Sequence, residues 1–288
     1  MFISISISVF LKKTILLYQI PALQVIVILQ GATFAVILPF MMKMKFKFFK
    51  KKALTDNILR NILYTFGLWL LYSSLKYIPI NVNVGIQFLV PVCSVVLAIF
   101  ILKERNSIFI WLSFFACIIG AVVIRGGFAI KVSEFEMRAY ILLASFVVVR
   151  SFGNILNRQL AIKYNTRTLV FYSHTIMFFL SFVAMLLFRS YRAIPIDIFL
   201  SLCGFGLMYL IEYCLIFRAF KYCSVLTIQP LEFSKMIYAI ILSNIFLNEA
   251  FTKHQIVGSI LIALGFMSSI FDKRVQRNRN TKTIKKQS

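Results

Sequence analysis

Charged residues are scarce in this chain of 288 residues, where Asp, Glu, Lys and Arg together make up 14%. A soluble domain carries roughly 25%. Acidic side chains are the scarcest, because 9 Asp and Glu stand against 32 Lys and Arg. Hydrophobic residues make up 60% of the chain, and a soluble protein of this length could not bury so much apolar surface. The composition therefore excludes an ordinary soluble domain and predicts helices that lie in a lipid bilayer.

Sequence motifs of catalysis and of metal or cofactor binding are missing. The five cysteines form no Cys-x-x-Cys pair, the two histidines begin no His-Glu-x-x-His motif, and no glycine-rich nucleotide-binding loop is present. We therefore predict no catalytic residue, no metal site and no cofactor. The net charge of +23 could suggest a nucleic-acid partner, but the charges stand in short clusters between apolar runs. That pattern is typical of the loops of membrane proteins, so we expect no nucleic acid.

Nine apolar runs have about the length of a spanning helix, which needs roughly 20 residues. They cover 22–42, 58–75, 81–102, 108–124, 139–157, 168–188, 197–217, 224–247 and 255–271. A tenth run at 2–18 is interrupted by Lys12 and Lys13 and predicts a short first helix. The expected fold class is all-α integral membrane, with ten transmembrane helices.

The distribution of Lys and Arg predicts how these helices are oriented. With the N-terminus inside, the predicted cytoplasmic segments hold 21 of the 32 basic residues and the predicted outer segments hold 7. Cytoplasmic loops of membrane proteins carry such an excess. We therefore expect a multi-pass protein of the inner (plasma) membrane, with a cytoplasmic C-terminus and a basic cytoplasmic tail at 273–288. Lys12 and Lys13 are exceptions, because they fall near the predicted outer end of the first helix.

The chain matches itself when it is shifted by 145 residues. In this register Lys76 falls on Lys221, Tyr77 on Tyr222, Glu104 on Glu249 and Gly120 on Gly265. We therefore expect two repeats of five helices, at 1–127 and 138–272. Because five is an odd number, the second repeat enters the membrane from the opposite side. Inverted repeats of this kind are a recurring architecture of secondary transporters.

Both predicted repeats contain an apolar helix with a proline, a glutamate near its end and a following helix with a late glycine. The first repeat has Leu89-Val90-Pro91-Val92-Cys93, Leu102-Lys103-Glu104-Arg105 and Trp111 to Gly120, and the second has Gln229-Pro230-Leu231-Glu232, Leu247-Asn248-Glu249 and Gly258 to Gly265. This pattern resembles the EamA family of the drug/metabolite transporter superfamily. The resemblance implies a ten-helix inverted-repeat fold that moves small organic metabolites across the inner membrane. The stretch from Pro230 to Glu249 also resembles members that take up S-adenosylmethionine.

Polar side chains inside the predicted spans are candidates for the path of a substrate or proton, since such groups are costly in lipid unless paired or hydrated. Arg150 lies near the middle of its run, and Asn154 follows at i+4 on the same helix face. Glu232 and Lys235 are spaced i, i+3 and can pair with each other. Gln87 falls on Glu232 in the repeat register, so both repeats present a hydrogen-bonding group at that depth.

Two further candidates complete the predicted path. Glu212 lies beside Tyr209 and Tyr213, and it could carry protons or pair with Arg150. His174 could relay protons or could pack as a hydrogen-bonded side chain. The alternative for the charged candidates is a set of ion pairs that only holds the bundle together.

The sequence as a whole predicts a secondary transporter that moves a small organic metabolite by alternating access, with S-adenosylmethionine or an amino-acid-like solute as substrate. The lack of a nucleotide-binding motif predicts that a gradient or an exchange supplies the energy. The alternatives are a non-transporting, decayed membrane paralogue, which the short first helix would fit, and an intramembrane enzyme. The expected partners are the small-molecule substrate and the lipid bilayer, and a homodimer is left open.

Overall fold

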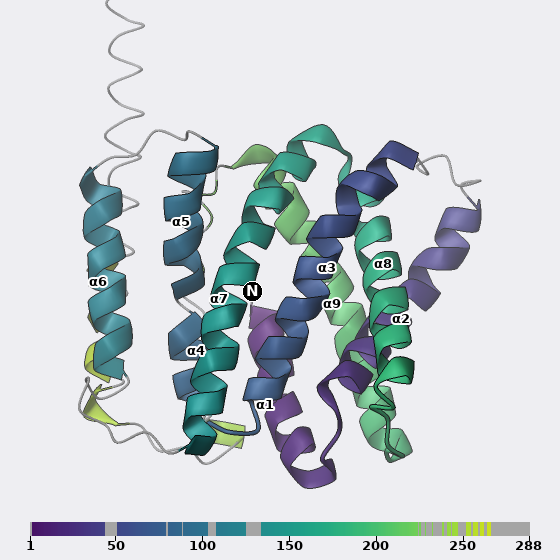
Figure 1. Ribbon diagram of the computed structural model, residues 1–288, viewed down its shortest axis with the longest axis horizontal. Helices are drawn as coiled ribbons and strands as arrows, with labels where there is room; N and C mark the ends of the chain where they lie inside the picture. The colour runs from purple at the N-terminus through teal and green to yellow at the C-terminus, as the bar shows by residue number, and fades with distance from the viewer. Residues whose placement is uncertain are drawn as a thin grey trace, which may run out of the picture.

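The computed structural model describes residues 2–43, 51–78, 80–87, 89–102, 108–124 and 134–223, together with scattered positions from 225 to 265. Every regular element in this part of the chain is a helix, and Figure 1 shows the helices running side by side as a bundle. The helices are α1 (Phe2–Tyr18), α2 (Ala22–Lys43), α3 (Lys51–Ser74), α4 (Ile80–Gln87), α5 (Leu89–Ile101), α6 (Ile108–Ile124), α7 (Glu134–Lys163), α8 (Thr166–Leu187) and α9 (Ile196–Tyr222).

The helices follow the predicted apolar runs closely. α1, α2 and α6 begin and end within one residue of the predicted limits. α3 and α7 extend beyond the runs 58–75 and 139–157, because a helix satisfies its own backbone hydrogen bonds whether lipid or water surrounds it. The predicted spans 224–247 and 255–271 lie largely outside the described residues, so the count of ten helices stays a prediction.

Five stretches of the described chain are long and apolar enough to cross a bilayer. They are Ala22–Phe40, Val82–Ile101, Met137–Lys163, Thr166–Leu187 and Ile196–Tyr222. The second of them runs through α4 and α5, which correspond to the single predicted span 81–102. α1 has 17 residues, so its length is about 25 Å. That is shorter than the hydrocarbon core of a bilayer, which is about 30 Å thick.

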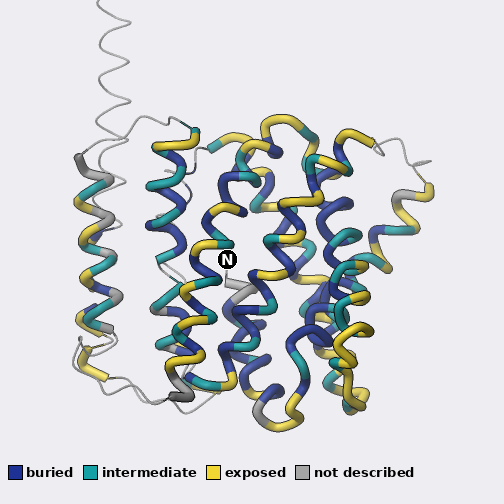
Figure 2. The backbone as a smooth tube through the Cα atoms, in the orientation of Figure 1, coloured by how far each residue is buried: buried dark blue, intermediate teal, exposed yellow. Residues whose placement is uncertain are grey.

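The bundle is apolar on its outside and polar within. On α8, the side chains of Phe179, Val183 and Leu186 share one face and are each about half exposed. Ser173 and His174 on the opposite face are fully buried. Figure 2 shows exposed and buried positions alternating in the same way along the other helices. A helix of a soluble bundle has the reverse arrangement, so this surface suits a lipid environment.

Helices of the first predicted repeat pack against helices of the second. α3 packs most extensively on α7, and α2 packs on both α8 and α9. α2 and α9 approach closely at Gly206, where a Cβ atom would lie 2.5 Å from the backbone oxygen of Leu29 and 3.1 Å from the Cβ of Ala32. The missing side chain at Gly206 therefore allows the two helix backbones to approach each other.

A polar cluster joins the Lys51 end of α3 to the Lys163 end of α7. The ammonium of Lys163 donates a hydrogen bond to Asp56 Oδ2 and forms an ion pair with it. The hydroxyl of Tyr164 donates to the same oxygen at 2.6 Å. The bond from Lys163, followed by the bond from Tyr164, lowers the pKa of Asp56 below its ordinary value. These contacts place the two helix ends at the same side of the bundle.

Candidate functional site

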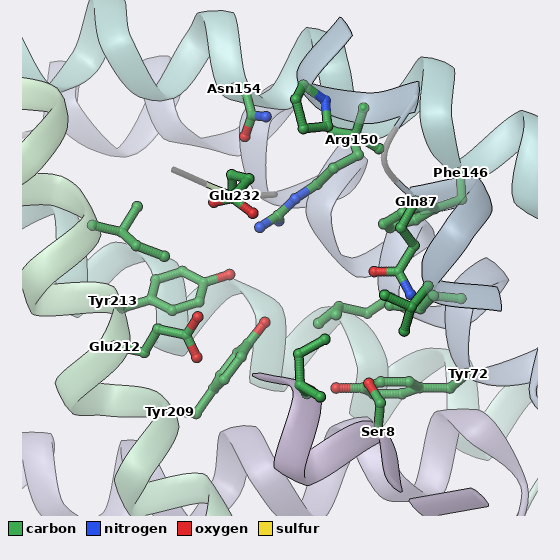
Figure 3. A pocket seen from close by; sticks show the side chains of 17 residues that line it. Ser8, Tyr72, Gln87, Phe146, Arg150, Asn154, Tyr209, Glu212, Tyr213 and Glu232 are labelled. Carbon is green, nitrogen blue, oxygen red and sulfur yellow. The ribbon is translucent and has the colours of Figure 1, made fainter. Parts of the chain in front are cut away.

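A central cavity lies between α1, α3, α4, α5, α7 and α9, and Glu232 also reaches it (Figure 3). Its volume is about 80 Å³, which is room for several water molecules. Five of the seven predicted path residues line it: Gln87, Arg150, Asn154, Glu212 and Glu232. The structure thus brings together residues that are far apart in the sequence.

Arg150 is the cation in the described wall of the cavity. It lies in α7, half-buried, and its guanidinium points into the cavity towards the carboxylate of Glu232 (Figure 3). The charge of Glu232 attracts it, and the ring of Tyr64 lies 4.0 Å from the guanidinium carbon. A guanidinium held over an aromatic ring is fixed in orientation by a cation–π contact. Arg150 is therefore positioned to bind an anionic group in the cavity.

One face of α9 supplies a carboxylate and two phenols. Tyr209, Glu212 and Tyr213 are spaced i, i+3 and i+4, so they share a helix face, and all three are at least 95% buried. Figure 3 shows this face turned to the cavity, with the Glu212 carboxylate between the two phenols. The arrangement puts negative charge and hydrogen-bonding hydroxyls opposite Arg150.

Gln87 is held in place by a chain of hydrogen bonds. Its Nε2 donates to Asn83 Oδ1 at 2.7 Å, and Asn83 Nδ2 donates to Ser74 Oγ at 2.7 Å. The chain links α4 to the end of α3, and it leaves the Oε1 atom of Gln87 turned to the cavity (Figure 3). Gln87 can therefore accept a hydrogen bond from a solute.

A layer of buried polar side chains adjoins the cavity on the side of the Lys51 end of α3. This polar layer consists of Arg60, Asn61, Tyr64, Asn157 and Ser173. The Arg60 guanidinium donates to oxygens of Asn61 and Ser173, and to Asn157 Oδ1 at 3.2 Å. Asn157 donates to the Tyr64 hydroxyl, which in turn donates to Asn154 Oδ1 at 3.2 Å. The polar layer is thus connected to the cavity wall through Asn154.

Arg60 is the candidate that the sequence does not single out. In the sequence Arg60 stands near the start of the predicted run 58–75, and the structure buries it inside α3 with 0% exposure. All three of its hydrogen bonds go to neutral oxygens, and its Nε atom has no partner among the described residues. The sequence signal for Arg60 was the spacing of its polar neighbours. Counted from Arg60, Asn57, Asn61 and Tyr64 stand at i−3, i+1 and i+4, and they give this part of α3 a polar face.

Replacing Arg60 with alanine is expected to lower the free energy of unfolding by about 2–4 kcal/mol. The oxygens of Asn61, Asn157 and Ser173 would lose their donor, and the missing side chain would leave a void. The measurement is unfolding of the purified protein in detergent. Arg218→Ala is the control, because Arg218 is exposed on α9, and it should change stability by less than about 0.5 kcal/mol. Equal losses in both variants would contradict a stabilising role of Arg60.

The two other predicted path residues are not in the described cavity wall. His174 is fully buried, with Nδ1 2.6 Å from Gln30 Oε1 and 3.0 Å from Thr33 Oγ1. These contacts link α8 to α2, and the ring centroid of His174 lies 4.9 Å from that of Tyr213. The use of His174 as a proton relay stays a prediction. Lys235 lies outside the described residues. Within the described chain, no three His, Cys, Asp or Glu side chains are grouped to hold a metal ion.

Comparison with known proteins identifies the family. The sequence model of the EamA-like transporter family matches residues 1–126 and 137–271. No curated protein matches the chain. A solved structure titled "Crystal structure of protein" has the same fold, with a TM-score of 0.69 and 17% identity over 95% of this chain and 98% of its own. The apolar helices and the family match together show a multi-pass membrane protein that belongs to the EamA-like transporter family.

Proposed function

We propose that the protein is a secondary transporter that moves a small organic metabolite across the cytoplasmic membrane by alternating access. The observation that carries the proposal is the central cavity, where Arg150 meets Glu212 and Glu232 within otherwise apolar helices. Charged groups inside a membrane bundle are costly unless they serve a path or a binding site. The match of the chain to the EamA-like transporter family supports transport as its activity.

Corresponding positions of the two proposed repeats meet at the cavity. Four pairs of lining residues are separated by 145 residues: Ile5 and Arg150, Leu68 and Tyr213, Leu71 and Ile216, and Gln87 and Glu232. This pairing supports two similar halves, at 1–127 and 138–272, that surround one site. If their orientations are opposite, the halves can exchange conformations and open the cavity to one side and then to the other.

The charges of the cavity favour a solute that carries both signs. Arg150 can bind a carboxylate in a forked geometry, and Glu212 or Glu232 can bind an ammonium group. An α-amino acid carries both groups, and so does S-adenosylmethionine. We therefore infer an amino-acid-like solute. The cavity is compact, at about 80 Å³, and alternating access would require the surrounding helices to move as a solute enters and leaves.

The second candidate is a non-transporting, decayed paralogue with a degraded first helix. α1 forms a regular helix of 17 residues and brings Ile5 and Ser8 to the cavity wall, which favours a working transporter. On the distribution of Lys and Arg we propose the inner (plasma) membrane and a cytoplasmic C-terminal tail. A homodimer is left open.

Transport by the purified protein tests the proposal. The protein is reconstituted into liposomes and offered labelled S-adenosylmethionine and the labelled amino acids, each with and without an excess of the same unlabelled solute inside. We expect saturable uptake of at least one solute, accelerated by the unlabelled solute inside, and none in protein-free liposomes. Folded protein that carries none of these solutes in either direction would favour the decayed paralogue.

A further inference from the structure

A second hollow lies on another face of α1. This lateral groove has a volume of about 600 Å³ and is formed by α1, α9 and the described residues between 238 and 246. It is lined by Ser6, Val9, Phe10, Lys13, Thr14, Leu17, Tyr18, Ile198, Phe205, Tyr238, Leu242 and Phe246. Ile5 and Ser8 of the same helix line the central cavity, so α1 lies between the two hollows.

The wall of the groove is mostly apolar, and Lys13 is its charged side chain. Ser6 is hydrogen-bonded to Tyr238 at 3.2 Å, and the Thr14 hydroxyl donates to the backbone oxygen of Phe10 at 3.1 Å. Lys13 is exposed, and no described residue forms a hydrogen bond or ion pair with it. An occupant that fits must be apolar along most of its length and anionic at one end.

The position of Lys13 along α1 places its ammonium near the membrane surface. Lys13 precedes the end of α1 at Tyr18 by five residues, which is about 7.5 Å along the axis. A lysine side chain at that depth extends to the lipid headgroups while its stem stays against apolar surface. Tyr18, also in the groove, is a residue type enriched at this interface.

We propose that the lateral groove binds one acyl chain of an anionic phospholipid, whose phosphate contacts Lys13. The apolar side chains of α1 and α9 contact the chain, and the ammonium of Lys13 supplies the complementary charge. This assignment also gives a role to a lysine that departs from the distribution of basic residues in the rest of the chain. The lipid site does not depend on which solute the central cavity carries.

Native mass spectrometry of the whole protein tests the proposal. The protein is taken from bilayers of equal phosphatidylglycerol and phosphatidylcholine, and the last lipid retained at rising collision energy is identified. The wild type is expected to retain phosphatidylglycerol about fivefold over phosphatidylcholine, the effect of one basic side chain at an anionic headgroup. Lys13→Gln should abolish this preference. Lys253→Gln, which removes an exposed lysine outside the groove, should keep it.

A second variant keeps the test decisive if Lys13→Gln folds poorly. Leu17 is 65% exposed, lies one turn from Lys13 in the groove and stands next to the end of α1 at Tyr18, so a carboxylate there can reach the headgroups. Leu17→Glu should therefore fold and place a carboxylate beside the ammonium. The preference for phosphatidylglycerol should then disappear. The same preference in the wild type and in the folded variants would overturn the proposal. A mass of two chains that is lost in Leu17→Glu would assign the groove to a second copy of the protein instead.

Discussion

Alanine in place of Arg150 is expected to slow saturable uptake into liposomes at least about 30-fold, the effect of roughly 2 kcal/mol on a buried charge contact. The variant loses the cation that points into the central cavity. It also removes positive charge from the side of the cavity that faces Glu212 and Glu232, which disfavours an anionic solute there. The measurement is the initial uptake rate against solute concentration.

Two further variants separate the charge of Arg150 from its shape and from general damage. Arg150→Lys keeps the charge but loses the planar fork, so an intermediate rate is expected. Arg138→Ala removes an exposed arginine of the same helix and should leave the rate unchanged. Full uptake by folded Arg150→Ala would exclude Arg150 from the solute path.

Alanine in place of Gly206 is expected to lower the free energy of unfolding by about 1–3 kcal/mol, the usual result of an added methyl group in a filled contact. The new Cβ would lie 2.5 Å from the backbone oxygen of Leu29, and a backbone atom cannot rotate away as a side chain can. α2 and α9 would have to separate. Unfolding of the purified protein in detergent measures the change.

Gly204 provides a matched control on the same helix. It is exposed, and a Cβ at that position would have no neighbour within 4 Å. Gly204→Ala should therefore leave stability unchanged or raise it slightly, because alanine restricts the unfolded chain. The same loss in both variants would show that the effect comes from the membrane or detergent environment, and not from the contact with Leu29.

The helices could be predicted from the sequence where the need to span the bilayer sets their limits. A bilayer requires about 20 apolar residues in a row, and α6 begins and ends at the limits of the predicted run 108–124. The ends of α3 and α7 could not be predicted in this way. They continue into the polar region, where Asp56 and Lys163 join them, and hydropathy gives no limit there.

The candidate site was predictable where a charge stood in the middle of an apolar run. Arg150, Glu212 and Glu232 meet this condition, and all three line the central cavity. Arg60 stands at the border of a run, where a basic residue normally marks a loop. The polar spacing around it was the only sequence sign of its burial, and the structure shows α7 and α8 covering it. Gly206 shows the same limit, since nothing in the sequence tells which glycine of α9 faces α2.

The polar layer has a consequence for how easily the bundle can change shape. α3 meets α7 and α8 through Arg60, Asn61, Asn157 and Ser173, whose contacts are hydrogen bonds. If these helices separate, water can replace each bond, and the net change is about 1.5–3 kcal/mol per bond, because the Arg60 donor is charged. An apolar contact would lose about 25 cal/mol for every Å² exposed to water. At the polar layer, α3 can therefore part from α7 and α8 with water taking the place of each lost partner, which an apolar contact at the same position would not allow.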